Sequence, residues 1–266
     1  MKNSYRRDCL LGVLSGALML VGDLCLSVIP ASAGDSGLFL REAYLSGSYP
    51  AWRLPLLLGT GVLGMALSYF TVRAARAQIR PECRRLRWLI TISGAVYVSS
   101  AGVIHLLIGS LADWTSTLGP LLGREETAAL VLGQYQRLTA ALILPYLGMI
   151  VLILASFWAV ASGRSILPRK MALVHMLVWQ IVFAGIPDLR QALGAEISTW
   201  DFVLSQGSGN AALLLWMLAS ALCAKQTVKG GMEYAGKDHA LRCAGDHAAD
   251  PLRPCPGVPG PGRHPG

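Results

Sequence analysis

Charged residues are scarce in this sequence. Asp, Glu, Lys and Arg make up 14% of the 266 residues, whereas average soluble domains carry about 25%. Hydrophobic residues reach 53%, and the mean hydropathy is +0.49. This balance argues against a soluble globular protein and predicts an integral membrane protein.

Motifs for several common enzyme chemistries are also absent. The sequence contains no Walker loop, no HExxH zinc motif and no GxSxG nucleophile turn. Its six cysteines include no CxxC pair, which argues against a zinc ribbon or a thioredoxin-like site. The multiple-histidine patterns of membrane desaturases and ceramidase-like hydrolases are missing as well. We therefore expect no metal site and no cofactor, and the sequence does not decide whether the chain is an enzyme.

Strand-type alternation of apolar and polar residues is not visible anywhere in the chain. Instead, apolar runs recur at about the 20-residue length that a membrane-spanning helix needs. Helices are favoured because a lipid-exposed strand edge would leave backbone groups without hydrogen-bond partners. We predict an all-α bundle of six transmembrane helices, over residues 9–30, 52–72, 88–111, 138–162, 171–187 and 202–224.

Basic residues are distributed unevenly over the predicted loops. The loop Arg73–Arg87, RAARAQIRPECRRLR, holds six arginines, and 18 of the 23 Lys and Arg residues fall on one side of the predicted membrane. Cytoplasmic loops show this excess, so both termini are predicted in the cytoplasm. Attraction to anionic lipid accounts for the same residues, and we do not expect nucleic acid as a partner. The composition suggests a bacterium, so the predicted location is its inner (plasma) membrane, with the lipid bilayer as partner.

The predicted transmembrane domain covers residues 1–228, and the composition changes after it. The final stretch, PLRPCPGVPGPGRHPG, cannot bury an apolar core, so residues 229–266 are predicted to form a disordered cytoplasmic tail. His239, Cys243 and His247 are spaced four residues apart and would share one face of a helix that could hold a metal. Such loose spacing arises easily by chance, and a flexible tail without a metal is the favoured interpretation.

The first apolar segment resembles a secretory signal peptide, since basic residues precede it and the sequence ASA at 31–33 provides a cleavage site. A signal-peptide apolar region runs about 7–15 residues, whereas the segment 9–30 is long enough to span a bilayer. It also contains Asp23, and a charged residue is unfavourable in the apolar region of a simple signal peptide. We therefore expect this segment to be retained as the first membrane helix. Gly12 and Gly16 form a GxxxG motif in it, which predicts a closely packed helix face.

Asp23 is the only acidic residue inside the six predicted spans. A carboxylate deep in a membrane helix costs about 2.5–3.5 kcal/mol, so it should face the bundle interior or a water-filled cavity. His105 in the third span lies at a matching depth, roughly 5–8 Å outside the midplane. An Asp23–His105 pair is therefore geometrically possible and could act as a proton site.

Further polar residues fall in the outer half of the predicted bundle, while the inner half is mostly apolar. We predict an outward-facing polar pocket there. Its candidate ligand-binding residues are Asp23, His105, Tyr146, Gln180 and Asn210. A structural role is the competing interpretation, because polar residues in membrane helices often only hold neighbouring helices together. His175, near the cytoplasmic start of the fifth span, is expected at the membrane interface.

Residues 59–64 read GTGVLG and match the GxGxxG pattern of dinucleotide-binding loops. That pattern requires a preceding strand and a surrounding soluble βαβ unit. Here it lies in the second apolar span, where small residues indicate close helix packing. A nucleotide site is therefore not expected.

Two short stretches, VGDLCLSVIP at 21–30 and SSAGVIHLLIGSLADW at 99–114, resemble an uncharacterised family of six-span bacterial membrane proteins, a domain of unknown function. The resemblance covers most of residues 8–225 and excludes the tail. It implies a six-span membrane protein and brings no reaction or ligand with it.

Three functions remain open from the sequence. The first is binding or transport of a small or amphipathic ligand, with Asp23 and His105 as a protonatable site. The second is an intramembrane enzyme that acts on a lipid-like substrate, with His105 as base and Asp23 orienting it. The third is a membrane subunit without catalytic activity. Because no strong nucleophile or metal-ligand set is visible, binding or transport is favoured, and the sequence indicates no oligomeric state.

Overall fold

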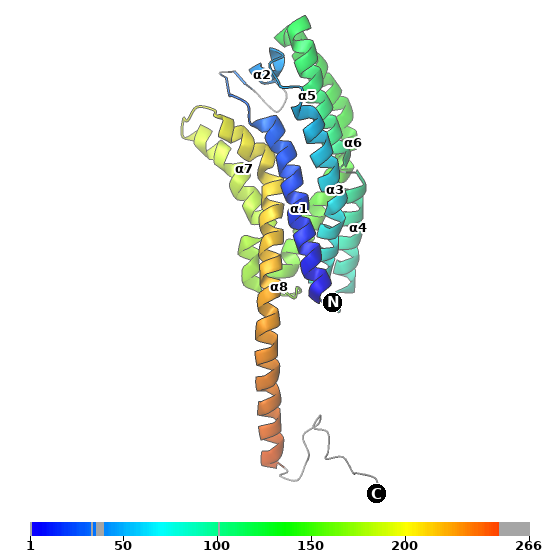
Figure 1. Cartoon of the computed structure of the whole chain (residues 1–266), viewed down its shortest axis with the longest axis vertical. Coiled ribbons are helices and arrows are strands. Elements are labelled where there is room, and N and C mark those ends of the chain that lie inside the picture. The colour runs from blue at the N-terminus through cyan, green and yellow to red at the C-terminus, as the bar shows by residue number, and fades with distance from the viewer. Residues whose placement is uncertain (1, 33, 36–39, 101, 250–266) are drawn as a thin grey trace. The chain divides into compact units, whose positions relative to one another are not determined.

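The fold is built from helices. The computed structural model describes residues 2–32, 34–35, 40–100 and 102–249, and no strand occurs among them. In chain order these residues form α1 (Lys2–Ser27), α2 (Glu42–Leu45), α3 (Arg53–Gln78), α4 (Arg84–Ser100), α5 (Gly102–Leu122), α6 (Arg124–Ala161), a 3-10 helix (Arg169–Val174), α7 (Met176–Ala192) and α8 (Thr199–Ala249). Figure 1 shows them, and the predicted all-α class is confirmed.

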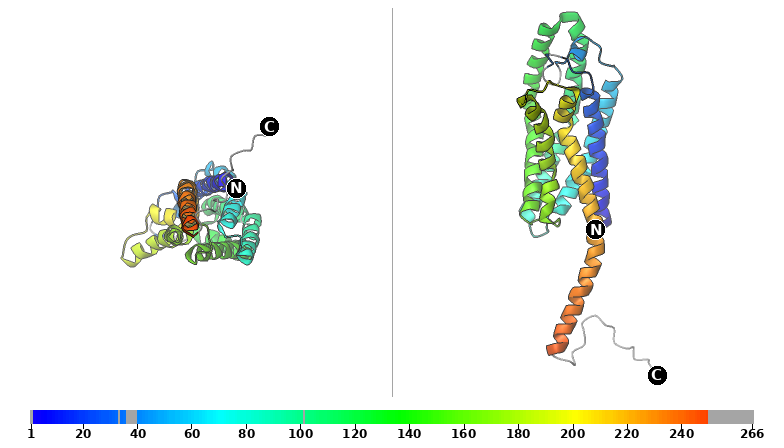
Figure 2. Two further views of the ribbon diagram at one scale, coloured as in Figure 1. Left: turned by 90° about the horizontal axis from the view of Figure 1, so that it is seen from below. Right: turned by 90° about the vertical axis from the view of Figure 1, so that its left-hand side faces the viewer.

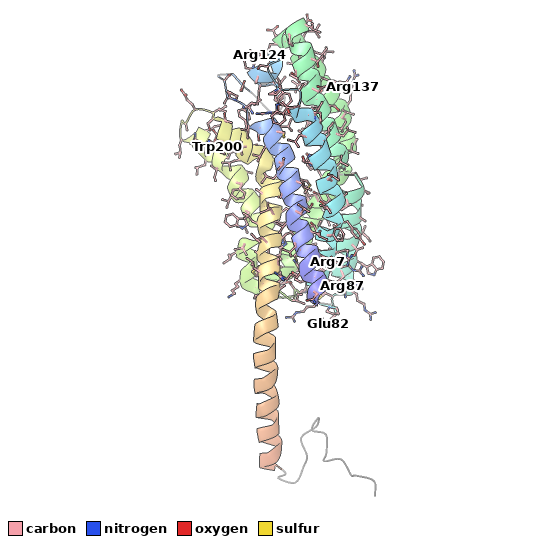
Figure 3. The ribbon with its side chains drawn as sticks, in the orientation of Figure 1. Arg7, Glu82, Arg87, Arg124, Arg137 and Trp200 are labelled. Atoms are coloured by element: carbon pink, nitrogen blue, oxygen red, sulfur yellow. The ribbon has the colours of Figure 1, made fainter. Side chains whose placement is uncertain are left out.

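Six helical segments of the described chain are long and apolar enough to cross a membrane. They are Asn3–Ser27, Arg53–Gln78, Arg84–Leu122, Ala141–Ala161, Arg169–Ala192 and Thr199–Ala224. Each overlaps one predicted span, so the prediction of a polytopic membrane bundle is confirmed. Arg7, Glu82 and Arg87 lie at one end of the bundle and Arg124 lies toward the other (Figure 3). The end that carries Arg7 is called the inner end below, and its cytoplasmic orientation stays a prediction.

The chain divides into two compact units, residues 1–221 and 222–266. The bundle lies in the first unit. The backbone of α8 is helical to Ala249, so residues 229–249 are helical where the sequence predicts disorder, and the alanines in this stretch favour a helix. Residues 250–266 and the side chains of the pattern His239, Cys243 and His247 lie outside the described part. The boundary at residue 228 and the metal-free tail stay predictions.

The helices of the third and fourth spans are longer than predicted. α5 continues to Leu122 and α6 begins at Arg124, so the predicted outer loop is instead a helical hairpin. Gly123 joins the two helices with a φ of 79°, in the left-handed region that glycine adopts without steric cost. The 38 residues of α6 span about 57 Å, well beyond a hydrocarbon core of about 30 Å. The hairpin therefore projects past the bilayer at the outer end, where α2 also lies (Figure 1).

α1 packs against both α3 and α8. On the α3 side, Ser15 Oγ donates to the carbonyl of Gly64 at 2.7 Å and lies 2.9 Å from Ser68 Oγ. On the α8 side, a Cβ added at Gly16 would lie 3.0 Å from the backbone nitrogen of Leu214. The missing side chain lets the two backbones approach, so the close packing predicted from the GxxxG motif is confirmed. Figure 2 shows α1 beside α8 in two further views.

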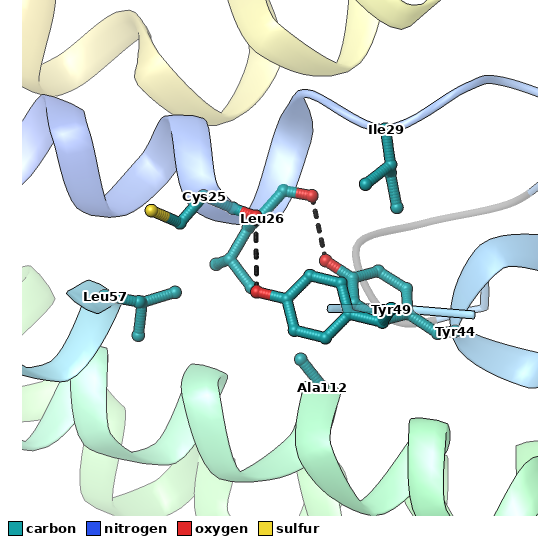
Figure 4. Packing of buried hydrophobic residues seen from close by; sticks show 7 residues of the cluster. All are labelled: Cys25, Leu26, Ile29, Tyr44, Tyr49, Leu57 and Ala112. Carbon is teal, nitrogen blue, oxygen red and sulfur yellow. Dashed lines mark hydrogen bonds between the residues drawn. The ribbon is translucent and has the colours of Figure 1, made fainter. Parts of the chain in front are cut away.

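The last turn of α1 presents carbonyl groups that have no partner within the helix, and later side chains satisfy them. Tyr44 Oη donates to the carbonyl of Leu26 at 2.8 Å (Figure 4). Tyr49 Oη donates to the carbonyl of Cys25 at 3.2 Å, in the same view. These groups sit in an apolar cluster whose members are Cys25, Leu26, Ile29, Tyr44, Tyr49, Leu57 and Ala112. The two phenols therefore hold the end of α1 within a dry environment.

Arg41 adds a charge to this arrangement and is fully buried. Its guanidinium donates to the carbonyl of Ser27 at 2.9 Å and to that of Ile29, and it lies 3.5 Å from Asp35. It also lies 4.0 Å from the ring centroid of Phe202. Burial lowers the pKa of Arg41, and the Asp35 carboxylate opposes that shift. A cation is favoured at a helix C-terminus, so Arg41 connects α1 to the loop and to α8.

The side chains of Arg41, Tyr44 and Tyr49 are named the α1 cap, and we expect it to loosen at alkaline pH. Burial raises the pKa of Tyr49 to about 12 and also raises that of Tyr44, because an ionised phenol is poorly solvated there. An unfolded phenol ionises near pH 10. The unfolded state therefore loses protons from about pH 10 upward, while the folded state still keeps them.

The free energy of unfolding should then be insensitive to these phenols below about pH 10 and should fall as pH rises toward about 12. The measurement is the unfolding free energy in detergent micelles against pH, together with phenolate absorbance. Tyr49→Phe should show a smaller alkaline loss than the parent chain. An identical loss in both proteins would contradict the prediction.

Candidate functional site

A cavity of about 320 Å³ lies inside the bundle, between helices that are distant in the sequence. All five side chains predicted for a pocket line it. They are Asp23 on α1, His105 on α5, Tyr146 on α6, Gln180 on α7 and Asn210 on α8. The fold thus brings the five residues together around one space, and their role in binding a ligand stays a prediction.

Asp23 has a hydrogen-bond partner that the sequence reasoning did not select. Asn210 Nδ2 donates to Asp23 Oδ2 at 2.7 Å. Asp23 is 9% exposed, and its other oxygen, Oδ1, accepts no hydrogen bond within the described part. No ion pair joins Asp23 to His105 among the described residues. Asp23 and His105 lie at matching depth and line the same cavity. However, the depth of a residue along its helix does not determine which side chains it contacts.

His105 is positioned by a glycine on the neighbouring helix. A Cβ added at Gly61 would lie 2.8 Å from His105 Cγ and 3.0 Å from its Nδ1, so the imidazole packs directly against the backbone of α3. Gly61 belongs to the GTGVLG stretch. Gly64 in the same stretch admits the side chain of Met19 and the carbonyl of Ser15 in the same way. These contacts confirm close packing as the role of those two glycines.

Five methionines line the cavity, and the sequence reasoning missed them. The chain has eight methionines, and those at the cavity are Met19, Met65, Met149, Met176 and Met217. Each comes from a different helix, so no spacing along the sequence could have indicated them. Unbranched thioether side chains adapt to irregular shapes. The apolar part of the cavity wall is therefore suited to a flexible ligand.

Two polar side chains at the cavity were also missed, and each has an atom without a partner in the described part. These atoms are Thr71 Oγ1 and Gln206 Oε1. Thr71 is 5% exposed. Because buried polar atoms normally have a hydrogen-bond partner, both side chains leave capacity for a polar group inside the cavity.

The cavity reaches further toward the inner end than the sequence predicts. Along α8 its lining residues run from Ser205 to Met217, a rise of about 18 Å. Thr71 and Ser156 add polar groups in the inner half, on α3 and α6. The expectation of a pocket confined to the outer half was therefore wrong, because single polar residues on separate helices gave no periodic signal.

Ser156 and His175 form a hydrogen bond that resembles a catalytic pair. Ser156 Oγ lies 3.2 Å from His175 Nε2. However, Nδ1 of His175 accepts from the backbone N–H of Leu177 at 3.2 Å, so the proton of a neutral ring is on Nε2. The Ser156 hydroxyl donates to the carbonyl of Ile153 at 2.9 Å. His175 therefore donates to Ser156 and cannot act as its base in this arrangement.

His175 is fully buried among aromatic side chains. Its ring centroid is 4.4 Å from that of Trp216 and 5.4 Å from that of Phe157, and its depth at the membrane interface stays a prediction. As the residue that precedes α7, it caps that helix through Leu177. Its role in the structure is to fix the start of α7 against α6 and α8.

Comparison with known proteins gives a family but no activity. The chain matches the family of unknown function DUF6796 over residues 1–227, which include all six membrane segments and the cavity. Searches of curated proteins and of solved structures found no significant match. The resemblance inferred from the stretches at 21–30 and 99–114 is confirmed, and the chain belongs to the family of unknown function DUF6796.

Proposed function

We propose that this protein binds a single-chain amphipathic molecule within the membrane. The polar head of the ligand lies at Asp23 and Asn210, and its hydrocarbon chain lies along the methionine-lined part of the cavity. The observation that carries the proposal is the cavity itself, which combines one carboxylate with an otherwise mostly apolar wall.

The charge of the lining favours a cationic head. Among the described residues that line the cavity, Asp23 is the one with a formal charge, and none is a lysine or an arginine. A buried carboxylate held by a single amide donor is poorly compensated. A protonated amine would supply the missing charge and hydrogen bonds. Tyr97 and Tyr146, which also line the cavity, offer aromatic rings that attract cations.

The shape of the cavity favours a hydrocarbon chain. The residues that line it on α8 run from Ser205 to Met217, a rise of about 18 Å. This extent suits an extended hydrocarbon chain. Burying such a chain is favourable by about 0.8 kcal/mol per methylene group relative to water, and the methionines can adjust to its bends.

The alternative of catalysis gains no specific support. His105, the predicted base, makes no contact with Asp23 that would orient it, because Asp23 accepts from Asn210 instead. His175 donates a hydrogen bond to Ser156 and so cannot remove the proton of its hydroxyl. Location in the inner (plasma) membrane of a bacterium, with the inner end in the cytoplasm, remains part of the proposal. The excess of arginine at that end supports it.

The test measures capture of a photoreactive dodecylamine by the full chain in phosphatidylcholine nanodiscs. The expected crosslinks fall on α6 and α8 peptides that line the cavity. Asp23→Asn should weaken amine binding by roughly 10- to 100-fold, the equivalent of one hydrogen bond to a charged group. A dodecanoate probe with the same photoreactive chain should lose no affinity in this variant, because it lacks the cationic head.

Asp113→Asn is the matched control, since Asp113 is exposed and does not line the cavity. It should leave amine binding unchanged. Equal amine affinity of Asp23→Asn and the parent chain would refute the cationic site, and crosslinks outside the cavity would refute the binding proposal as a whole.

A further inference from the structure

We propose that the ligand enters the cavity sideways from the bilayer, through a groove between α6 and α7. This inference rests on the proposed binding function and adds the route and the source of the ligand. The occupant of the groove during entry is the hydrocarbon chain of an amphiphile dissolved in the membrane.

The first argument is continuity between the groove and the cavity. The groove has a volume of about 330 Å³ and lies between α6 and α7. It shares Met149, Ile153 and Gln180 with the cavity. The two spaces therefore share part of their lining, and two of the three shared side chains are flexible and unbranched.

The second argument is the surface that surrounds the groove. Ile150, Leu154 and Ile181 line it and are 48%, 50% and 64% exposed. All three lie within the membrane segments Ala141–Ala161 and Arg169–Ala192. At that depth the exposed side is hydrocarbon, so an acyl chain can enter the groove from the bilayer without crossing a polar surface.

The third argument is the loose packing of α7. In the segment Arg169–Ala192, only 11% of the most apolar stretch is buried inside the protein. The corresponding share is 39–44% for the segments of α1, α3, α6 and α8. α7 lies at the periphery of the bundle in both further views (Figure 2). Pro187 removes one backbone hydrogen bond inside this helix. The middle of α7 is therefore easier to displace than α1, α3, α6 or α8.

Both ends of α7 are nevertheless fixed. His175 is buried at its start, and Arg190 near its end is paired with Asp201 of α8 at 2.9 Å. A displacement would therefore bow the central turns and leave the ends in place. Gln180 lies on those turns and is the one polar residue among those that line the groove. Its amide can accompany the polar head from the membrane to Asp23.

The test separates the rate of entry from the final affinity. Ala184 lines the groove, and Ala184→Trp should fill it from the lipid side. The full chain in phosphatidylcholine nanodiscs is mixed with photoreactive dodecylamine and illuminated after increasing delays. Capture by Ala184→Trp should be slower by about tenfold, with an equilibrium affinity within about twofold of the parent chain. Ile181→Trp is a second variant should the first fail to fold.

Ala95→Trp is the matched control, because Ala95 is an exposed alanine on α4 that lines neither space. If Ala184→Trp, or Ile181→Trp in its place, captures the probe as fast as Ala95→Trp, the side entrance is refuted and entry from the outer aqueous face takes its place. That result leaves the Asp23→Asn effect intact, so the binding proposal would stand. If Asp23→Asn has no effect while Ala184→Trp still slows capture, the cationic site fails and the entrance is supported.

Discussion

Arg41→Met is expected to destabilise the protein by about 3–5 kcal/mol, the usual cost of removing one partner from a buried ion pair. The guanidinium and the Asp35 carboxylate are both 0% exposed. Methionine keeps the length of the side chain but not its charge or its hydrogen-bond donors. Asp35 is then left without its counter-charge, and the carbonyl of Ser27 loses its donor. The free energy of unfolding, measured in mixed detergent micelles, reports the loss.

Two comparisons make this prediction specific. Arg124→Met removes a closer pair, with Glu42 at 3.0 Å against 3.5 Å for Arg41 and Asp35, but both of its side chains are about half exposed. It should therefore cost less than about 1 kcal/mol. The double variant Arg41→Met with Asp35→Leu should regain part of the loss, because no unpaired charge remains. If Arg41→Met and Arg124→Met cost the same, burial does not determine the strength of the pair and the account of the α1 cap is wrong.

Gly16→Leu is expected to be similarly severe, at roughly 3–5 kcal/mol, and to abolish amine binding as well. The new side chain would meet the backbone of α8 at Leu214, and a backbone atom cannot rotate aside. α1 and α8 would therefore separate. Asn210 would then no longer reach Asp23, which leaves a buried carboxylate without its donor. Unfolding in micelles and capture of the dodecylamine probe measure the two effects.

Gly59→Leu is the control for this variant. Gly59 lies on α3, and a Cβ added there would meet nothing within 4 Å. Replacing it should leave both readouts unchanged or raise stability slightly, since glycine inside a helix costs about 0.5–1 kcal/mol. A Gly16→Leu protein as stable as Gly59→Leu would show that close approach of α1 and α8 is not needed for the fold.

Composition and hydropathy predicted the helix class and the number of spans, because the bilayer sets helix length and polarity directly. They did not predict the hairpin joined at Gly123. That segment lies outside the hydrocarbon, where a helix needs no long apolar run, so hydropathy ended the spans too early. The α1 cap was missed for another reason. Arg41 and Tyr44 reach carbonyl groups on α1 that carry no side-chain signal in the sequence.

The candidate site was predicted in its members but not in its contacts. Asp23 and Asn210 were both predicted as polar residues in the outer half of the bundle, yet no pattern in the sequence favoured pairing them over Asp23 with His105. Depth is one coordinate, whereas pairing also depends on which helices are neighbours and how each is rotated. The same limit explains why the methionines of the cavity were not predicted. An apolar residue within an apolar span is not distinctive until the helices are assembled.

The contact between Asp23 and Asn210 joins residues 187 positions apart, and this fixes an order during synthesis. At about 5–20 residues per second, the ribosome takes roughly 10–40 s to reach Asn210 after Asp23 has been made. During that interval α1 is already in the membrane and its carboxylate has no amide donor. The helix that carries the donor is the last of the six to arrive, so the cavity closes only at the end of insertion. A chain arrested before α8 would leave Asp23 without its amide donor and the glycine face of α1 without the helix that covers it.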